Sequence, residues 1–401
     1  MKKCRITFAC LILSWIGCMG KISAESEFFP NELQSLYAHS AVVIDGNSGR
    51  VLFGKNSEKK MPMASTTKIM TCILALEMGN PEDTAQVSER AALQPEVRLG
   101  ASVGETFYMG DLLYALMLES YNDAAVMIAE AISGSVELFT MQMDQKARDL
   151  GCEHTHFVTP NGLDGEDEEG IHETCARDLA QIMKYCVWDS VKAEEFLKIT
   201  QTRQYSFFNV QGDREYVCSN HNTFPDQYPA VISGKTGFTS AAGYCYVCAA
   251  QMGERKFAAV VLASGWPYNR TYKWQDMKKL LDYAKTHYYE VNLPYPEKQR
   301  TVEVDHGWEK GRNPWENIQI PVYFERKKDN KFLLGDSEIL IRRIEWRKKV
   351  KAPIMKDEIL GRIQFNIGEK VVWEGMIRAS KAVKRPVLKN WFDWTLQKIL
   401  L

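Results

Sequence analysis

The sequence predicts a mixed α/β domain of the α+β kind, followed by a smaller all-β domain and a terminal amphipathic helix. Up to about residue 290, runs with helical apolar periodicity are mixed with short strand-like runs. Beyond "NLPYPEKQ" (292–299) the chain alternates in short apolar strands with few helix signals. With 401 residues, the chain is long enough for two domains, one of them with a sizeable core.

The elements of the first domain follow from these patterns in chain order. Strands are expected at 41–53 (two strands around a Gly/Asn turn), 243–251 and 257–264. Helices are expected from Pro62 towards Met78, over 111–132 with a break near 120–123, and at 137–149, 173–199 and about 271–289.

The first 24 residues have the three-part layout of a secretory signal peptide. A basic start precedes an apolar run (6–19), and "KISA" ends in small residues. The apolar run is shorter than the about 20 residues that a membrane span needs. We therefore expect export with cleavage near Ala24. A membrane anchor and lipidation at Cys18 are the alternatives.

The net charge and the spacing of cysteines and histidines argue against nucleic-acid binding, a disulfide framework and a metal site. The net charge is −1, so nucleic acid is not an expected partner. Three of the ten cysteines lie in the leader, and the remaining odd number has no regular disulfide spacing. Cys245 and Cys248 are three apart on a predicted strand and face opposite sides, which disfavours a shared metal. The histidines form no H-E-x-x-H pattern, and "HETC" (172–175) has no second half. No metal and no cofactor are expected.

The last stretch, 386–401, predicts an amphipathic helix with an apolar side opposite Lys389, Asp393 and Gln397. It is too short to span a membrane. Two tryptophans and a phenylalanine beside basic residues suit a membrane surface. We expect peripheral anchoring, with a helix docked on its own domain as the alternative.

The residues that carry chemistry begin with "PMASTTKIMTCILALEM" (62–78), where Ser65 and Lys68 share one face of a helix. The same spacing recurs at Ser57–Lys60 in a polar turn, so S-x-x-K alone is weak. A serine needs a base to become a nucleophile. A lysine can be that base only if burial or a second cation lowers its pKa well below about 10.4. Lys235 is the candidate second cation, and 120–122 adds a third polar element.

In the order S-x-x-K, S-x-N and K-T-G, these motifs resemble those of the penicillin-binding serine D-Ala-D-Ala carboxypeptidases, the low-molecular-mass penicillin-binding proteins of peptidase family S11. The blocks "FVTPNGLDG" and "GKTGFTSAAGY" are also similar to that family. The resemblance implies a β-lactamase/transpeptidase-like catalytic domain over 30–290, a β-rich domain over 296–380 and a membrane-anchoring helix over 386–401. Tyr121 and Phe238 depart from the glycine and histidine that are commoner there.

The resemblance further implies an acyl-enzyme mechanism on peptidoglycan stem peptides that end in D-Ala-D-Ala. Ser65 would attack the penultimate D-alanine carbonyl with neutral Lys68 as base, and Ser120 would relay a proton to the leaving D-alanine. The backbone N–H groups of Ser65 and Phe238 would form the oxyanion hole. The implied substrate-binding residues are Asn122, Lys235, Thr236, Gly237, Phe238 and Arg270, the last with a solvated arginine as the alternative. A β-lactam would acylate Ser65 and leave slowly. The implied location is the extracytoplasmic face of the cell membrane, towards the cell wall.

Three other functions share these motifs: a β-lactamase, a D,D-endopeptidase and a non-catalytic wall protein that binds stem peptides. A class A β-lactamase would add a glutamate in an E-x-x-L-N loop, which the acidic run at 166–169 lacks. The intact motifs argue against the non-catalytic binder. The endopeptidase stays open as an alternative.

Overall fold

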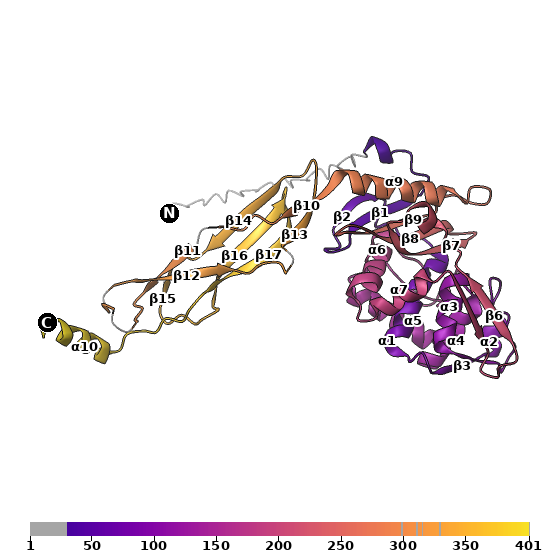
Figure 1. Cartoon of the computed structure of the whole chain (residues 1–401), viewed down its shortest axis with the longest axis horizontal. Helices are drawn as coiled ribbons and strands as arrows, with labels where there is room; N and C mark the ends of the chain where they lie inside the picture. Colours follow the sequence, from indigo (N-terminus) through magenta and orange to yellow (C-terminus); the bar gives the residue numbers. More distant parts are fainter. Residues whose placement is uncertain (1–29, 298–299, 310–311, 315, 329, 401) are drawn as a thin grey trace, which may run out of the picture.

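The computed structural model describes residues 30–297, 300–309, 312–314, 316–328 and 330–400, so the predicted signal peptide (1–24) lies outside the described residues. A region of helices around a sheet is followed by an elongated region of strands, and helix α10 (Leu388–Ile399) lies at the far end (Figure 1). This order confirms the predicted fold class.

One antiparallel sheet lies at the centre of the first region. Its strand order is β2-β1-β9-β8-β7, with bounds β1 (Ser40–Asp45), β2 (Val51–Lys55), β7 (Val231–Thr239), β8 (Gly243–Met252) and β9 (Arg255–Leu262). The unbroken apolar runs of β1 and β9 are buried, as expected for strands covered on both faces. Strand β7 forms one edge of this sheet.

Helices cover both faces of the sheet (Figure 1). Helix α9 (Tyr272–His287) packs on one face, and α6 (Ala176–Lys184) packs on the other. The remaining helices, most of which extend the core on the side of α6, are α1 (Lys68–Met78), α2 (Glu89–Ala92), α3 (Met109–Tyr114), α4 (Asn122–Ser133), α5 (Val136–Asp149), α7 (Ala193–Gln201) and α8 (Phe224–Gln227). Two two-stranded sheets, β3 (Thr84–Gln86) with β4 (Thr106–Tyr108) and β5 (Gln204–Phe208) with β6 (Glu215–Ser219), complete the first region.

The predicted helical runs differ from the observed helices in detail. The break expected near 120–123 is present, because a turn of π-helix, η3 (Ala115–Glu119), ends α3 before α4 begins. The run at 173–199 is two helices, α6 and α7, separated by a second π turn, η4 (Tyr185–Asp189). No helix in the described part of the chain is long and apolar enough to cross a membrane alone; the bent pair α4 and α5 reaches that length and composition only jointly.

The second region is a six-stranded sheet in the order β14-β16-β17-β12-β11-β15. Its bounds are β11 (Arg300–Asp305), β12 (Ile318–Phe324), β14 (Leu340–Trp346), β15 (Lys349–Lys351), β16 (Ile359–Ile367) and β17 (Lys370–Ala379). Strand β10 (Tyr288–Asn292) continues directly from α9 and pairs with β13 (Lys331–Gly335). Arg50 in the first region forms a 2.6 Å ion pair with Glu338, which fastens the two regions to each other.

Candidate active site

Ser65 lies in a tight 3₁₀ turn, η2 (Ala64–Thr67), directly before α1. The sequence predicts an α-helix that already includes this serine, so the observed α-helix begins later than predicted. The hydroxyl of Thr66 donates to the Met63 carbonyl at 2.6 Å, and that of Thr67 donates to the Ala64 carbonyl at 2.8 Å. Ala64 has a left-handed φ of 49°, which a residue with a side chain rarely adopts. The fold therefore holds the serine in a constrained turn.

Lys68 follows this turn and is fully buried. Its Nζ lies 2.9 Å from Ser65 Oγ, 2.9 Å from Asn122 Oδ1 and 2.6 Å from the Asn161 carbonyl oxygen. Amide and peptide oxygens can only accept hydrogen bonds. In a neutral lysine they take up both N–H groups, so the lone pair of Nζ is left facing the Ser65 hydroxyl.

The surroundings favour that neutral form. Burial first, and then the charge of Lys235, hold the pKa of Lys68 well below its usual value, while Asp123 acts in the opposite direction. Burial also lowers the pKa of Lys235 to about 7. The sequence predicts that a lysine base needs burial or a second cation to lower its pKa. Lys68 has both.

Ser120 and Asn122 enter the site from the break between η3 and α4. Ser120 has a left-handed φ of 68° at the end of the π turn, and its Oγ accepts a hydrogen bond from Lys235 Nζ at 2.9 Å. Asn122 donates from Nδ2 to the Pro95 carbonyl at 3.1 Å, which fixes the amide with Oδ1 towards Lys68. The helix break thus connects the two lysines through short polar side chains.

The K-T-G motif lies on β7 and passes close to the nucleophile turn. A β-carbon on Gly237 would lie 3.0 Å from the Ser65 backbone nitrogen and 3.1 Å from Ala64 Cβ, so a larger residue would push the strand away. Phe238 is 41% exposed, and its ring centroid lies 4.6 Å from that of Tyr244.

These elements enclose a cleft of about 410 Å³. Of the predicted site residues, it is lined by Ser65, Ser120, Lys235, Thr236, Gly237 and Phe238. Lys68 and Asn122 are buried and bonded to each other, and Lys68 contacts the lining residue Ser65. The structure therefore brings together every predicted site residue except Arg270.

Arg270 is exposed and is not among the residues that line the cleft, so its role as a carboxylate partner stays a prediction. It precedes α9 in an exposed turn, and its carbonyl oxygen accepts a hydrogen bond from Lys273 Nζ at 2.7 Å. Lys273 lines the cleft instead, with Nζ 4.7 Å from the Tyr244 ring centroid and 4.5 Å from that of Trp274. Burial, and then the charge of Arg270, lowers the pKa of Lys273 to about 8.

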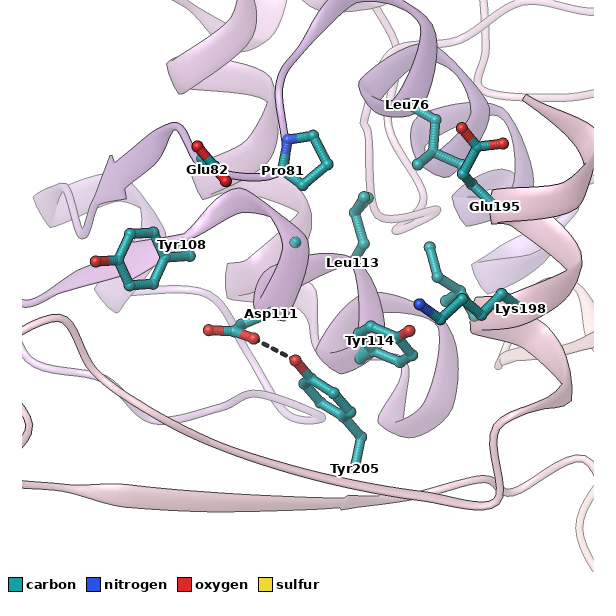
Figure 2. A pocket seen from close by; sticks show the side chains of 12 residues that line it. Leu76, Pro81, Glu82, Tyr108, Asp111, Leu113, Tyr114, Glu195, Lys198 and Tyr205 are labelled. Carbon is teal, nitrogen blue, oxygen red and sulfur yellow. Dashed lines mark hydrogen bonds between the residues drawn. The ribbon is translucent and has the colours of Figure 1, made fainter. Parts of the chain in front are cut away.

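A larger hollow of about 900 Å³ lies elsewhere in the first region (Figure 2). It is lined by α3, α7 and β5, and its polar centre is a 2.6 Å hydrogen bond from the Tyr205 hydroxyl to Asp111. The predicted site residues all belong to the described part of the chain, and none of them lines this hollow. The predicted catalytic residues therefore identify the smaller cleft as the candidate active site.

Two supporting groups had no signal in the sequence analysis. The Asn161 carbonyl that contacts Lys68 belongs to the backbone, which no residue type reveals. His172 is buried, with Nδ1 accepting from the Val158 N–H at 3.0 Å and Nε2 lying 2.8 Å from Thr67 Oγ1. Burial lowers the pKa of His172 to about 3, so it supports the nucleophile turn as a neutral group.

Gly162 supports the same turn, and its replacement by alanine is expected to cost about 1–3 kcal/mol more stability than the replacement of Gly100. Both glycines have left-handed φ, +88° and +73°, so both substitutions carry a similar backbone penalty. A β-carbon on Gly162 would lie 2.0 Å from the Ala64 carbonyl oxygen, whereas nothing lies within 4 Å at Gly100. Denaturant unfolding of the two variants measures the difference, and equal losses would contradict it.

Comparisons with known proteins identify the family of this chain. The family model of D-alanyl-D-alanine carboxypeptidases, peptidase family S11, matches residues 27–265. The chain is 31% identical over 370 residues to the D-alanyl-D-alanine carboxypeptidase DacF of Bacillus subtilis, covering 89% of this chain and 90% of that protein.

Two solved structures are similar as well. Penicillin binding protein 5 from Haemophilus influenzae is 22% identical with a TM-score of 0.68, over 87% of this chain and 98% of that one, and supports the fold. Penicillin-binding protein D2 from Listeria monocytogenes, solved in a cefotaxime-bound form, is 26% identical with a TM-score of 0.54, over 63% of this chain and 98% of that one. Since the family model covers more than half of the chain and DacF matches almost all of it, this chain belongs to the serine-type D-alanyl-D-alanine carboxypeptidases of peptidase family S11.

Proposed function

We propose that this carboxypeptidase removes the terminal D-alanine from peptidoglycan stem pentapeptides through an acyl-enzyme on Ser65. The observation that carries the proposal is the buried Lys68, with Nζ 2.9 Å from Ser65 Oγ and acceptor oxygens on both other sides. As Oγ bonds to the carbonyl carbon of the penultimate D-alanine, the hydroxyl proton passes to Nζ of Lys68.

The developing negative charge on the carbonyl oxygen needs donors that are already in place. We assign this role to the backbone N–H groups of Ser65 and Phe238, because β7 and the nucleophile turn approach each other closely at Gly237. When the C–N bond breaks, the proton that Lys68 took from Ser65 passes through the Ser120 hydroxyl, whose Oγ is bonded to Lys235, to the leaving D-alanine nitrogen, and Lys68 is neutral again. Water then attacks the ester carbonyl, which releases the shortened peptide and restores the Ser65 hydroxyl.

The substrate's terminal carboxylate is assigned to the cationic end of the cleft. Lys235, Thr236 and Lys273 all line it, and they supply two ammonium groups and one hydroxyl. Asn122 would additionally hold the substrate amide. A penicillin carries a carboxylate near its reactive carbonyl, so it would occupy the same cleft and acylate the same serine.

The test is an assay of free D-alanine after incubation of the purified protein with a stem pentapeptide. We expect one D-alanine and one tetrapeptide for each terminal peptide bond that is cleaved. A cross-linked peptide dimer, offered separately, distinguishes the endopeptidase. Fast hydrolysis of a penicillin adduct would indicate a β-lactamase, and binding of pentapeptide without D-alanine release would indicate the non-catalytic protein.

The pH dependence of kcat/KM should decline on the alkaline side from about pH 7. A lysine with a pKa of about 7 is charged below that pH and neutral above it, so Lys235 loses its attraction for the substrate carboxylate as the pH rises. Lys273, with a pKa of about 8, adds a second step. Initial rates at limiting pentapeptide measure the profile. The variant Lys273→Met should lose only the step near pH 8, and a flat profile through both values would contradict the assignment.

We also propose that the protein is exported and held on the extracytoplasmic face of the membrane by α10, with domains at 30–290 and 296–380. Support comes from the leader-like residues 1–24 and from the apolar side chains of α10. No described residue of α10 is buried, and Leu388, Phe392 and Ile399 are 88%, 66% and 74% exposed. Its 12 residues suit the interface of a bilayer and not a span across it.

Truncation before Pro386 is expected to release the protein from membranes without loss of D-alanine release, because α10 lies far from strand β7 (Figure 1), which contributes to the lining of the cleft. Sedimentation of vesicles with each form of the protein measures the partition. A full-length variant Phe392→Glu should bind more weakly than wild type. Unchanged sedimentation of the truncated form would rule out α10 as the sole anchor.

A further inference from the structure

Three metal-binding side chains converge beside the N-terminus of α6, apart from the cleft. Donor atoms of His154, Cys175 and Asp178 all lie within 4.8 Å of one another. Cys175 and Asp178 are 0% and 1% exposed. The donors come from two segments, the turn after α5 and the start of α6, which fold against each other.

The imidazole of His154 has an unsatisfied nitrogen. Its Nδ1 is buried and has no hydrogen-bond partner among the described residues. A buried polar atom without a partner is unfavourable, and folded proteins leave few of them. A ligand that accepts the nitrogen lone pair would satisfy this atom, which is what a metal ion does.

The carboxylate is already held in place by neighbouring donors. Asp178 Oδ2 accepts hydrogen bonds from the His154 backbone N–H at 2.8 Å and from Thr155 Oγ1 at 3.0 Å. Thr155 Oγ1 also lies 2.7 Å from Thr174 Oγ1, next to Cys175. Hydrogen bonds of this kind orient metal ligands in known sites.

A second cluster, Asp144, His156 and Glu169, meets the same distance criterion but differs in this respect. Both ring nitrogens of His156 are occupied, at 2.8 Å from Asp144 and 2.9 Å from Asp167. The side chains of that cluster already pair with one another, and no nitrogen of His156 is left for a metal ion. We therefore infer no metal site there.

We propose that His154, Cys175 and Asp178 bind one zinc ion. Thiolate, imidazole and carboxylate are the ligand types of zinc, whereas calcium and magnesium prefer oxygen alone. Three protein ligands leave the fourth tetrahedral position to a water molecule. On binding, the S–H bond of Cys175 breaks, its proton is released to solvent and the thiolate bonds to zinc. The sequence alone predicts no metal here, because "HETC" has no recognisable second half. The proposed second half, "CEH" (152–154), lies about 20 residues earlier in the chain.

The ion would act on stability and not on the reaction. The segment that ends at Cys175 carries Thr174, paired with Met61 through backbone hydrogen bonds of 2.7 and 3.0 Å, and His172, which contacts Thr67. Zinc at Cys175 would therefore fasten the segment that supports the nucleophile turn. We expect a higher melting temperature with zinc and a lower one after chelation.

The experiment uses the full-length protein, purified in detergent, loaded with zinc chloride and desalted. Elemental mass spectrometry should find about one zinc per chain. Cys175→Ser and His154→Gln should weaken zinc binding about 100-fold or more, since even residues that only orient metal ligands cost 10–100-fold. Cys152→Ser is the matched control, because Cys152 is also buried and contacts the Asp178 carbonyl at 3.5 Å but is not one of the three donors. Cobalt loading should give a thiolate charge-transfer band that Cys175→Ser abolishes and Cys152→Ser retains.

Penicillin labelling of each variant verifies that it is folded. His154→Gln changes a partly exposed side chain, whereas Cys175 is buried. Zinc-free wild-type protein after loading would overturn the proposal. Equal zinc affinity in wild type and Cys175→Ser would do the same, as would a disulfide between Cys152 and Cys175 in the exported protein.

Discussion

Replacement of Ser65 by alanine is expected to abolish D-alanine release and penicillin labelling together. The alanine lacks the oxygen that both acyl-enzymes require, and loss of a nucleophilic serine costs on the order of 10⁶-fold in comparable hydrolases. The surrounding turn should persist, because the hydroxyls of Thr66 and Thr67 hold it and not that of Ser65. D-alanine assays and gel detection of a fluorescent penicillin measure the two losses.

The chain supplies its own control for this substitution. Ser57 has the same spacing to Lys60 as Ser65 has to Lys68, but it lies in the turn after β2. Ser57→Ala should therefore keep both activities. If Ser65→Ala retained either one, the nucleophile would have to lie elsewhere.

Replacement of Lys68 by arginine is expected to slow acylation by about 10²–10⁴-fold, the usual contribution of a general base. Arginine stays protonated at any pH that the protein survives, so it has no lone pair for the Ser65 proton. Methionine at the same position keeps a similar volume without the amine. It should cost as much activity and also some stability, because the buried oxygens of Asn122 and Asn161 lose their donor.

The second-order rate of penicillin labelling measures this effect without a need for turnover. Lys60→Arg, in the polar turn, is the control and should react like wild type. Wild-type labelling should slow at acid pH, where Lys68 becomes protonated despite its lowered pKa, and both Lys68 variants should lack this acid dependence. Near-normal labelling of Lys68→Arg would show that another group accepts the proton.

Much of the fold and site could be predicted because the relevant signals are local. The interval between Ser65 and Lys68 fits one helical turn, and the poor helix formers at 120–123 mark the break that Ser120 and Asn122 occupy. The apolar runs that became β8 and β9 are buried on both faces, so their continuous apolar character, without alternation, marked them as strands. The family resemblance then connected motifs that lie far apart in the sequence.

What could not be predicted depends on where loops turn in space. Arg270 and Lys273 are three residues apart, and nothing local reveals that the chain turns Arg270 outwards before α9 begins. The aromatic rings beside Lys273 come from α9 itself and from Tyr244 on β8, a contact that only the folded chain creates. The approach of Asn161 to Lys68 is likewise a backbone contact across 93 positions of sequence.

The placement of the K-T-G motif on a border strand bears on how the enzyme could evolve drug resistance. An extended peptide or a penicillin lying along β7 would be held largely by main-chain groups, which side-chain substitutions other than proline leave in place. Resistance would then have to arise through substitutions of side chains on this strand, such as Phe238. Any such substitution would also change the binding of the natural peptide.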